Sequence, residues 1–306
     1  MTNIPVLFIT FARPDYARKA FEAIKIARPG ILYFYSNKAR HDRPDEIERN
    51  EQIRAFINEV TWKCELYTFF REEHVDVYTS LWSAIDWIFS KEELAIILEE
   101  DCVASIAFFN FCEQLLPQYR DDNRIWVISG NNLIEGYNPN NYDYFFSYFP
   151  YMYGWASWQN RWQKVIRDRL PYEKIKEYHL FDQIYIKPTA VKQALKFTEK
   201  IVNTPAWDYR FTISMKCNGA FGIIPKVNLV SNIGISGVHN SGTQSLVHNR
   251  ILPDFDKYVI TNPPPFIVAD YGYSKHWFDT YYIKRNKLFY KIKRRLGSII
   301  KKSLSF

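Results

Sequence analysis

The sequence predicts an α/β fold in which a mainly parallel central sheet is flanked by helices. Short apolar runs of strand length alternate with amphipathic stretches of helix length through the first half of the chain. Of the 306 residues, 47% are hydrophobic, which is enough to bury a large core, and only 11 are glycine, which excludes glycine-rich low-complexity segments. Strands that alternate with helices pair in parallel through right-handed crossovers. Ligands of such sheets bind beyond the carboxyl ends of the strands.

The elements of the first half follow one another in a regular order. Pro14 and Asp15 open the first helix, because proline is tolerated in the first turn and an acidic side chain complements the helix dipole there. Apolar side chains at helical spacing predict the later helices. The expected strands are 6–11, 31–35, 65–70, 94–98 and 125–129, and the expected helices are 14–28, 44–60, 78–89 and 108–119.

The second half is less regular and rich in aromatic residues. A turn-rich loop at 136–141 leads into the aromatic segment 142–153. Helices are expected around 158–165 and 190–202, and strands near 221–230. We therefore expect one domain over 1–250, made of a regular half (1–132) and an irregular lobe (133–250) on the same core. An extension (251–282) and a terminal stretch (283–306) follow it.

The basic residues gather at the C-terminal end. The chain has a net charge of +7, and residues 283–306 contain nine basic residues and no acidic ones, so the rest carries −2. A nearly neutral body argues against nucleic-acid binding. Leu288, Ile292, Leu296 and Ile299 fall at near-helical spacing and predict a basic amphipathic helix, which can lie on an anionic membrane surface. A solvated tail is the alternative.

Other features exclude several classes of protein. No segment reaches the roughly 20 uninterrupted apolar residues that span a bilayer, and the N-terminus lacks the basic region of a secretory signal. We therefore expect a cytoplasmic protein, peripheral on the inner face of the plasma membrane if the tail binds lipid. The four cysteines form no CxxC pair and are expected to be reduced and mostly buried. P-loop, GxGxxG and GxSxG motifs are missing.

Three consecutive carboxylates, Glu99, Glu100 and Asp101, directly follow the apolar run Leu94–Leu98. Neighbouring carboxylates repel at a cost of about 1 kcal/mol per close pair in solvent, and a divalent cation would remove this repulsion. If the backbone stays extended, Glu99 and Asp101 point to one face and Glu100 to the other. Oxygen ligands of this kind favour Mg²⁺ or Mn²⁺, completed by diphosphate oxygens and water. A solvated charged turn is the alternative.

The order and spacing of several segments resemble the GT-A glycosyltransferases related to N-acetylglucosaminyltransferase I. The resemblance is closer to the bacterial surface-polysaccharide members of that group. It runs from about residue 5 to residue 245. The segments that carry it are Ile9–Asp15, Ile97–Cys102, Phe108–Cys112, Ile128–Asn132, Gly154–Trp158 and Trp207–Tyr209.

This resemblance implies a nucleotide-sugar site at the carboxyl edge of the sheet. Thr10 and Arg13 would contact the nucleotide or its diphosphate, and arginine suits this role because it binds anions with two parallel hydrogen bonds. Asn37 stands where the family usually has an acidic residue that faces the base, which puts uridine specificity in doubt. The acidic run would supply Glu99 to the donor sugar, Glu100 to the ribose, where the family more often has aspartate, and Asp101 to the metal.

Two further positions come from the same resemblance. Asp208 would be the general base of an inverting transferase, taking the proton of the acceptor hydroxyl; a first-turn helix acid is the alternative. His239 would complete the metal site or touch the diphosphate, and a polar loop histidine is the alternative. One or two members of a tryptophan set are expected to line the acceptor cleft, with core packing as the alternative for each. The set is Trp155, Trp158, Trp162 and Trp207.

The resemblance as a whole implies a hexosyl- or N-acetylhexosaminyltransferase. It would move a sugar from a nucleotide-diphosphate donor, expected to be a UDP-sugar, to a glycan or lipid-linked glycan acceptor. The reaction would be inverting, would depend on Mn²⁺ or Mg²⁺, and would serve surface polysaccharide or lipopolysaccharide synthesis. An inactive GT-A-like binding or scaffold protein is one alternative. A metal-dependent sugar nucleotidyltransferase is another, although the glycine-rich N-terminal loop of that class is missing.

Overall fold

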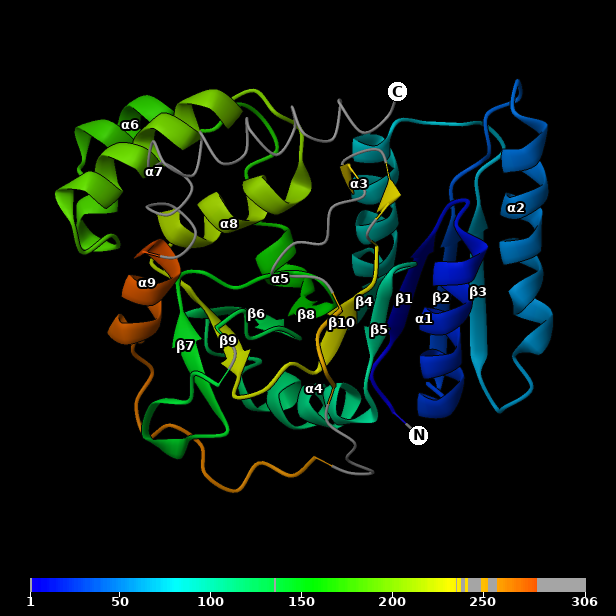
Figure 1. Cartoon of the computed structure of the whole chain (residues 1–306), viewed down its shortest axis with the longest axis horizontal. Coiled ribbons are helices and arrows are strands. Elements are labelled where there is room, and N and C mark those ends of the chain that lie inside the picture. The colour runs from blue at the N-terminus through cyan, green and yellow to red at the C-terminus, as the bar shows by residue number, and fades with distance from the viewer. Residues whose placement is uncertain are drawn as a thin grey trace, which may run out of the picture.

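A computed structural model describes residues 2–134, 136–234, 236–237, 240–241, 249–252 and 258–279, with the backbone alone at 236–237 and 240–241. It contains one large sheet with helices on both sides (Figure 1). The α/β class and the mainly parallel sheet flanked by helices are thus confirmed. The C-terminal stretch 283–306, predicted as a basic helix, lies outside the described residues.

The large sheet has eight strands in the order β3-β2-β1-β4-β8-β6-β9-β7. All of them run in one direction except β8 and β7, which are antiparallel to their neighbours. A two-stranded sheet pairs β10 with β5, and β11 pairs with β12. The strands are β1 (Val6–Thr10), β2 (Ile31–Ser36), β3 (Glu65–Phe70), β4 (Leu94–Glu99), β5 (Cys102–Ala104), β6 (Ile125–Ser129), β7 (Tyr144–Ser147), β8 (Trp155–Trp158), β9 (Phe221–Pro225), β10 (Val230–Asn232), β11 (Ser236–Gly237) and β12 (Asn240–Ser241).

The helices cover the two faces of the sheet. Side chains alternate along β1, so Phe8 packs with the apolar residues of α1 and α4, whereas Ile9 packs with those of α3 and α8. Further helices, α6, α7 and α9, gather around a separate apolar cluster beside β7. The helices are α1 (Pro14–Ala27), α2 (Pro44–Arg54), α3 (Val77–Phe89), α4 (Ile106–Gln118), α5 (Gln159–Trp162), α6 (Tyr172–Glu177), α7 (Pro188–Ile201), α8 (Trp207–Cys217) and α9 (Tyr271–Phe278), with 3₁₀ turns at Ala55–Glu59, Pro139–Asn141 and Leu180–Gln183.

The strand register brings the carboxyl ends of β1, β2 and β4 to one edge of the sheet. Within β1, Ile9 lies opposite both Tyr35 of β2 and Glu99 of β4. The loops that follow these strands therefore start side by side. This edge carries Arg13, Asn37 and the acidic run, as the parallel topology predicts.

Several expected elements differ from those observed. The helix expected at 44–60 ends at Arg54 and continues as a 3₁₀ turn. The helix expected around 158–165 is one short turn, Gln159–Trp162, because the preceding tryptophans form β8 between β4 and β6. Helix α9 lies in the 251–282 extension, where no element was predicted. In that extension Asp270 N donates to Phe146 O (2.8 Å), which ties the segment to β7.

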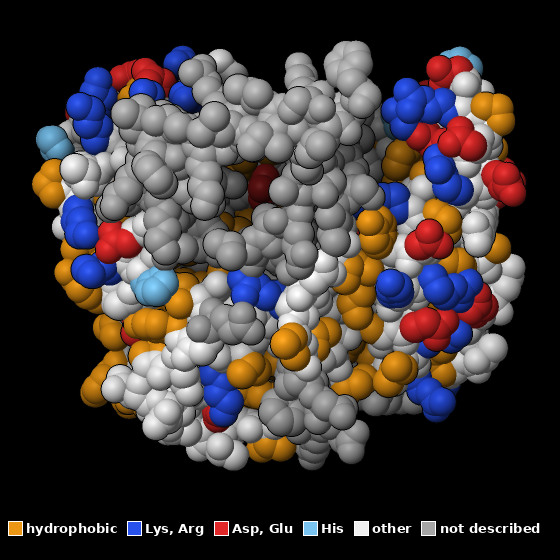
Figure 2. All heavy atoms as spheres, viewed as in Figure 1, with side chains coloured by type: hydrophobic (Ala, Val, Ile, Leu, Met, Phe, Trp, Pro, Cys, Tyr) orange, Lys and Arg blue, Asp and Glu red, His pale blue; other side chains and the backbone are white. Residues whose placement is uncertain are grey.

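The surface over α1 and α2 carries charges of both signs (Figure 2). Arg18 and Lys25 pair with Glu22 and Glu59 along this surface. Within the described part of the chain, no helix is both long enough and apolar enough to cross a membrane.

Candidate functional site

The backbone of the acidic run is not extended throughout. The expected alternation of its side chains between the two faces of the sheet depended on an extended backbone. Strand β4 ends at Glu99, and the chain turns at Glu100 and Asp101 before β5 begins. As a result, Glu100 and Asp101 both contact one cation, the guanidinium of Arg13. The expectation that Glu100 points to the opposite face from Asp101 is therefore wrong, because a turn does not preserve the two-residue period of a strand.

Arg13 binds two carboxylates at the start of α1. Its Nε lies 2.5 Å from Glu100 Oε1 and its Nη2 lies 2.9 Å from Asp101 Oδ2. The backbone N–H of Phe11 donates to the second oxygen of Glu100 (2.7 Å). Burial lowers the pKa of Arg13, but the two carboxylates more than offset burial and raise the pKa overall. In this structure the arginine predicted to meet the diphosphate thus neutralises part of the acidic run.

Asp101 is also held from the second half of the chain. Its Oδ1 accepts a hydrogen bond from Asn232 Nδ2 (3.2 Å), and its backbone carbonyl accepts from Ile233 N (2.8 Å). Sequence reasoning missed Asn232, because nothing in the local sequence pairs residues 131 positions apart. The signal that finds it is the pairing of β10 with β5, which only the fold provides.

Glu99 lies where negative charge accumulates. Part of the residue is exposed, yet burial of the carboxyl group raises its pKa to about 8. This value already includes the charges of Asp101 and Asp208, which raise the pKa as burial does, and the charge of Arg13, which lowers it. The fold therefore brings Glu99, Asp101 and Asp208 together, although 107 positions separate the last two in sequence. An added cation or a hydrogen-bond donor would stabilise the charged form of Glu99.

The donor set can be compared with what a divalent cation needs. Carboxylate oxygens are ligands of the kind that Mg²⁺ and Mn²⁺ prefer, and a carboxylate has about four acceptor sites, so Asp101 can bind a cation while accepting from Arg13 and Asn232. Charge and chemistry therefore fit a cation held by Asp101 near Glu99. Among the described residues no preassembled group of three or more His, Cys, Asp or Glu side chains is present. The second expected ligand, His239, lies outside the described residues.

Asp208 is the second residue of α8, whose N-cap residue is Ala206. The preceding residue, Trp207, stacks on Trp155 of β8, with ring centroids 5.0 Å apart and an interplanar angle of 18°. This stacking fixes the start of the helix against the sheet. Tyr153 also belongs to this neighbourhood, because the pKa of its hydroxyl is raised by burial and then by Cys102, Glu99 and Asp208. Sequence reasoning did not single out Tyr153.

The polar residues after β1 and β2 bind backbone. Thr10 Oγ1 donates to Tyr35 O (2.9 Å), across the β1–β2 pair. Asn37 Nδ2 donates to Val75 O (2.9 Å), and Asn37 Oδ1 accepts from Val75 N (3.3 Å). Asn37 thus shapes the loop after β3, and its role toward a base stays a prediction.

The tryptophans expected near an acceptor are buried. Trp155, Trp158, Trp162 and Trp207 each have at most 5% of their surface exposed. The expectation that one or two of them line an open cleft is therefore wrong, and the core-packing alternative holds. The sequence could not separate the two, because an indole that packs in a core and one that stacks on a sugar are the same residue type. All four cysteines are free, as expected, with Cys102 and Cys112 buried.

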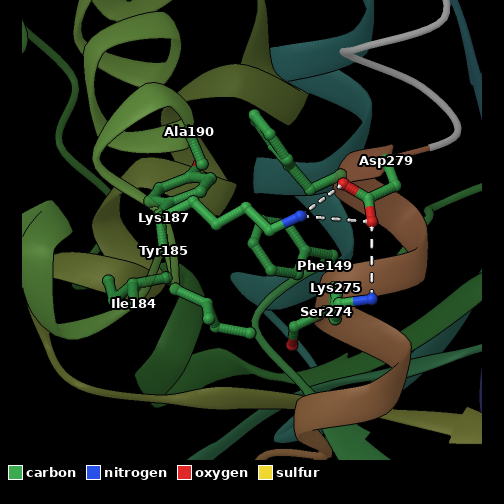
Figure 3. Close-up of a pocket in the computed structure, with 10 residues that line it drawn as sticks. Phe149, Ile184, Tyr185, Lys187, Ala190, Ser274, Lys275 and Asp279 are labelled. Carbon is green, nitrogen blue, oxygen red and sulfur yellow. Dashed lines mark hydrogen bonds and ion pairs between the residues drawn. The ribbon is translucent and has the colours of Figure 1, made fainter.

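A small cavity lies elsewhere, between β7, the loop before α7 and α9 (Figure 3). Its volume is about 10 Å³, and Lys187 and Lys275 both reach Asp279 at its rim (3.1 and 3.7 Å). No residue of the acidic run lines it. This cavity is too small for a nucleotide sugar.

Comparison with known proteins gives partial matches only. No family model matches the chain, and no curated protein sequence does. Similar solved structures include a mannosyltransferase, PcManGT, from Pyrobaculum calidifontis in complex with GDP-Man and Mn²⁺, at 10% identity and a TM-score of 0.36 over 54% of this chain and 46% of that chain. A UDP-glucose pyrophosphorylase complexed with UDP-glucose matches at 8% identity and a TM-score of 0.31, over 54% and 80%. The glycosyltransferase GlyE of Streptococcus pneumoniae matches at 13% identity and a TM-score of 0.30, over 60% and 38%. The matched region spans less than half the length of each of the two transferases.

Proposed function

We propose that this protein is a GT-A-type glycosyltransferase that transfers a sugar from a nucleotide-diphosphate donor to a glycan acceptor. The observation that carries the proposal is the convergence of Glu99, Asp101 and Asp208 at the carboxyl edge of the sheet. Structural carboxylates in a core are normally paired, whereas a carboxylate such as Glu99, whose pKa is raised and which lies at a ligand-binding edge of the sheet, is typical of a functional site. The order of sequence motifs, which resembles enzymes related to N-acetylglucosaminyltransferase I, supports the same function.

Each residue of the site has a distinct role in this proposal. The oxygen of the acceptor hydroxyl attacks the anomeric carbon of the donor sugar from the face opposite the diphosphate, which inverts the configuration. Asp208 takes the proton of that hydroxyl as the attack proceeds. Glu99 hydrogen-bonds the donor sugar, and Glu100 reaches the ribose. Thr10, Arg13 and Asn37 line the nucleotide side.

Asp101, with His239, would hold Mn²⁺ or Mg²⁺. When bound, the metal offsets the charge that develops on the departing diphosphate. Arg13 binds Asp101 Oδ2, so its guanidinium lies beside the carboxylate that would hold the metal. The donor, expected to be a UDP-sugar, thus meets one arginine and one metal ion at the same carboxylate.

The acceptor and location are the finer parts of the proposal. We place the reaction in surface polysaccharide or lipopolysaccharide synthesis, on the inner face of the plasma membrane, with a glycan or lipid-linked glycan as acceptor. The basic stretch 283–306 would bind anionic lipid. Phe266 and Val268, before α9, are 73% and 65% exposed while Ile267 between them packs on the core, which supports an apolar contact surface in this segment.

A thermal-shift panel of nucleotide sugars, with and without Mn²⁺, tests the proposal. A ligand that binds only the folded protein stabilises it by about 2.7 kcal/mol at 100 times its Kd. We expect one nucleotide sugar to raise Tm in the presence of Mn²⁺ and to do so more weakly without it. A panel in which no nucleotide sugar shifts Tm would contradict the proposal.

The two alternatives give different products. A nucleotidyltransferase would release pyrophosphate from a nucleoside triphosphate and a sugar 1-phosphate. An inactive binding protein would show the thermal shift but release no nucleoside diphosphate. Product analysis by chromatography after the thermal-shift panel therefore separates all three.

A further inference from the structure

The residues that follow β10 pack directly on the acidic run. Strand β10 pairs antiparallel with β5, and this register places Asn232 opposite Cys102, the neighbour of Asp101 (Figure 1). The next residue, Ile233, donates its N–H to the backbone carbonyl of Asp101 (2.8 Å). A segment of the second half of the chain is thus fixed to the turn that holds Asp101.

Hydrogen bonds at both the nitrogen and the oxygen of its amide group orient the side chain of Asn232. Its Nδ2 donates to Asp101 Oδ1 (3.2 Å), and its Oδ1 accepts from the backbone N–H of Gly234 (2.9 Å). Reversing the amide would place an oxygen against the carboxylate and an NH₂ group against the N–H of Gly234, and both contacts would be repulsive. Asn232 is 5% exposed and Asp101 9%, so water cannot readily replace either bond. The amide therefore presents a fixed donor to Asp101.

Gly234 leaves room for the other oxygen of the same carboxylate. A Cβ atom built on Gly234 would lie 2.1 Å from Asp101 Oδ2 and 2.9 Å from Asp101 Cγ. Real side chains do not make contacts this short, so any residue larger than glycine would push the carboxylate away. The glycine is needed here because of this close approach, and its backbone φ lies outside the left-handed region that itself favours glycine.

Asp101 is consequently held on several sides. Arg13 contacts Oδ2 from the first half of the chain, Asn232 contacts Oδ1 from the second half, and the backbone at Gly234 limits where Oδ2 can move. A carboxylate fixed in this way loses less conformational freedom when it binds a cation than a mobile one does. Mutation of a residue that hydrogen-bonds a metal-binding side chain typically lowers the metal affinity by about 10- to 100-fold.

We propose that Asn232 and Gly234 are positioning residues that orient Asp101 for a divalent cation. This inference rests on the proposed role of Asp101 in metal binding. According to this inference, a segment in the second half of the chain sets the metal affinity of the acidic run in the first half.

The test measures binding of Mn²⁺ alone to the full-length protein, by electron paramagnetic resonance, without any donor or acceptor. We expect Asn232→Ala to weaken Mn²⁺ binding by about 10-fold or more. Gly234→Ala should weaken it as well, because its methyl group displaces Asp101 Oδ2 while Asn232 stays intact. Gly234→Ala therefore gives an independent reading if Asn232→Ala does not fold.

Two matched controls separate positioning from general damage. Asn228→Ala removes another buried asparagine before β10, whose Oδ1 accepts from Asn132 N (3.0 Å) and not from the acidic run. Gly30→Ala adds a methyl group whose nearest neighbour, Thr2 O, would lie 3.8 Å away. Both controls should keep the Mn²⁺ affinity of the wild type.

The outcomes distinguish this inference from the proposed function. If Asp101→Ala loses Mn²⁺ binding while Asn232→Ala and Gly234→Ala keep it, the positioning role is overturned and the metal role of Asp101 stands. If Asp101→Ala binds Mn²⁺ as the wild type does, the metal role is overturned and the inference with it. Weakened binding in both positioning variants, with both controls unchanged, supports the inference.

Discussion

Two carboxylates in this protein, Asp143 and Glu99, have pKa values that are shifted in opposite directions. Asp143, at the start of β7, accepts from Lys226 Nζ (2.5 Å) and from the backbone N–H groups of Thr261 (2.6 Å) and Asn262 (2.7 Å). Burial alone would raise the pKa of Asp143, but these donors more than offset burial and lower it. At Glu99, burial and the charge of Asp101 prevail over Arg13 and raise the pKa to about 8.

The difference distinguishes a structural carboxylate from a group of carboxylates that we propose to bind a ligand. Asp143 has a full set of donors and joins β7 to the segment at 261–262, so it has little to gain from a ligand. In the acidic run, the charges of Asp101, Asp208 and Glu100 all act on Glu99. One arginine, Arg13, contacts two of these carboxylates, Glu100 and Asp101. A metal ion would supply positive charge to this run, and the hydroxyl groups of a nucleotide sugar would supply hydrogen-bond donors. The predictions below test this distinction, from the largest expected effect to the smallest.

Removing the proposed metal ligand should have the largest effect. We expect Asp101→Ala to lower kcat/KM for metal-dependent transfer by about 1,000- to 10,000-fold, because several kcal/mol of transition-state stabilisation depend on the metal. Asp45→Ala removes an exposed carboxylate that pairs with Arg49 on α2, and it should keep full activity. Steady-state kinetics of both variants give the comparison. Retained activity in Asp101→Ala would refute the metal assignment.

Replacing the proposed base should stop transfer but leave donor binding intact. We expect Asp208→Asn to lower kcat by about 100- to 1,000-fold, since proton abstraction contributes this much in comparable reactions. The donor Kd, measured by calorimetry, should change little, because the proposed mechanism assigns Asp208 to the acceptor hydroxyl. If transfer survives, another residue is the base.

The Asp143 cluster should respond in the opposite way. We expect Asp143→Ala to lower the free energy of unfolding by about 3 kcal/mol, because it leaves the partly exposed Lys226 amine and the N–H groups of Thr261 and Asn262 without their acceptor. Urea unfolding measures this loss. The kinetic constants of the folded fraction should match the wild type. A loss of activity without a loss of stability would erase the distinction between the two clusters.

Lys216 provides a smaller test with a buried cation. Its Nζ donates to Tyr185 Oη (3.2 Å) and lies 4.7 Å from the centre of the Phe149 ring, and burial lowers its pKa to about 8. The unfolded chain therefore binds more protons above the folded pKa, and stability gains from Lys216 as pH rises toward the ordinary lysine value. Lys216→Met removes this dependence.

The expected readout is a difference between two urea-unfolding series. At about pH 7 Lys216→Met should be more stable than the wild type by roughly 3 kcal/mol, and this gap should narrow by about 2 kcal/mol at about pH 9.5. A gap that does not change with pH would show that Lys216 does not titrate in this window.

The sequence predicted the regular half of the fold well and the irregular half less well. The strand at 94–98 and the helix from Pro14 were predictable because their apolar spacing and proline signals are local. Helix α9 and strand β8 were missed, since their packing against β7 and between β4 and β6 comes from distant residues.

The candidate site shows the same limit. The acidic run could be located from its place after a buried strand, and Asp208 from its motif. The turn at Glu100, the contacts of Arg13 and the role of Asn232 depend on backbone geometry and on contacts between the two halves. No single-sequence pattern encodes such contacts.

The central claim is that the acidic run supports transfer from a nucleotide sugar. The most direct measurement is release of nucleoside diphosphate from a panel of nucleotide sugars with Mn²⁺, compared between the wild type and Asp101→Ala. We predict that the wild type releases nucleoside diphosphate from at least one donor and that chelation of the metal stops this release. Asp101→Ala should release no nucleoside diphosphate above background. Equal release by both proteins, or none from any donor by the wild type, would contradict the central claim.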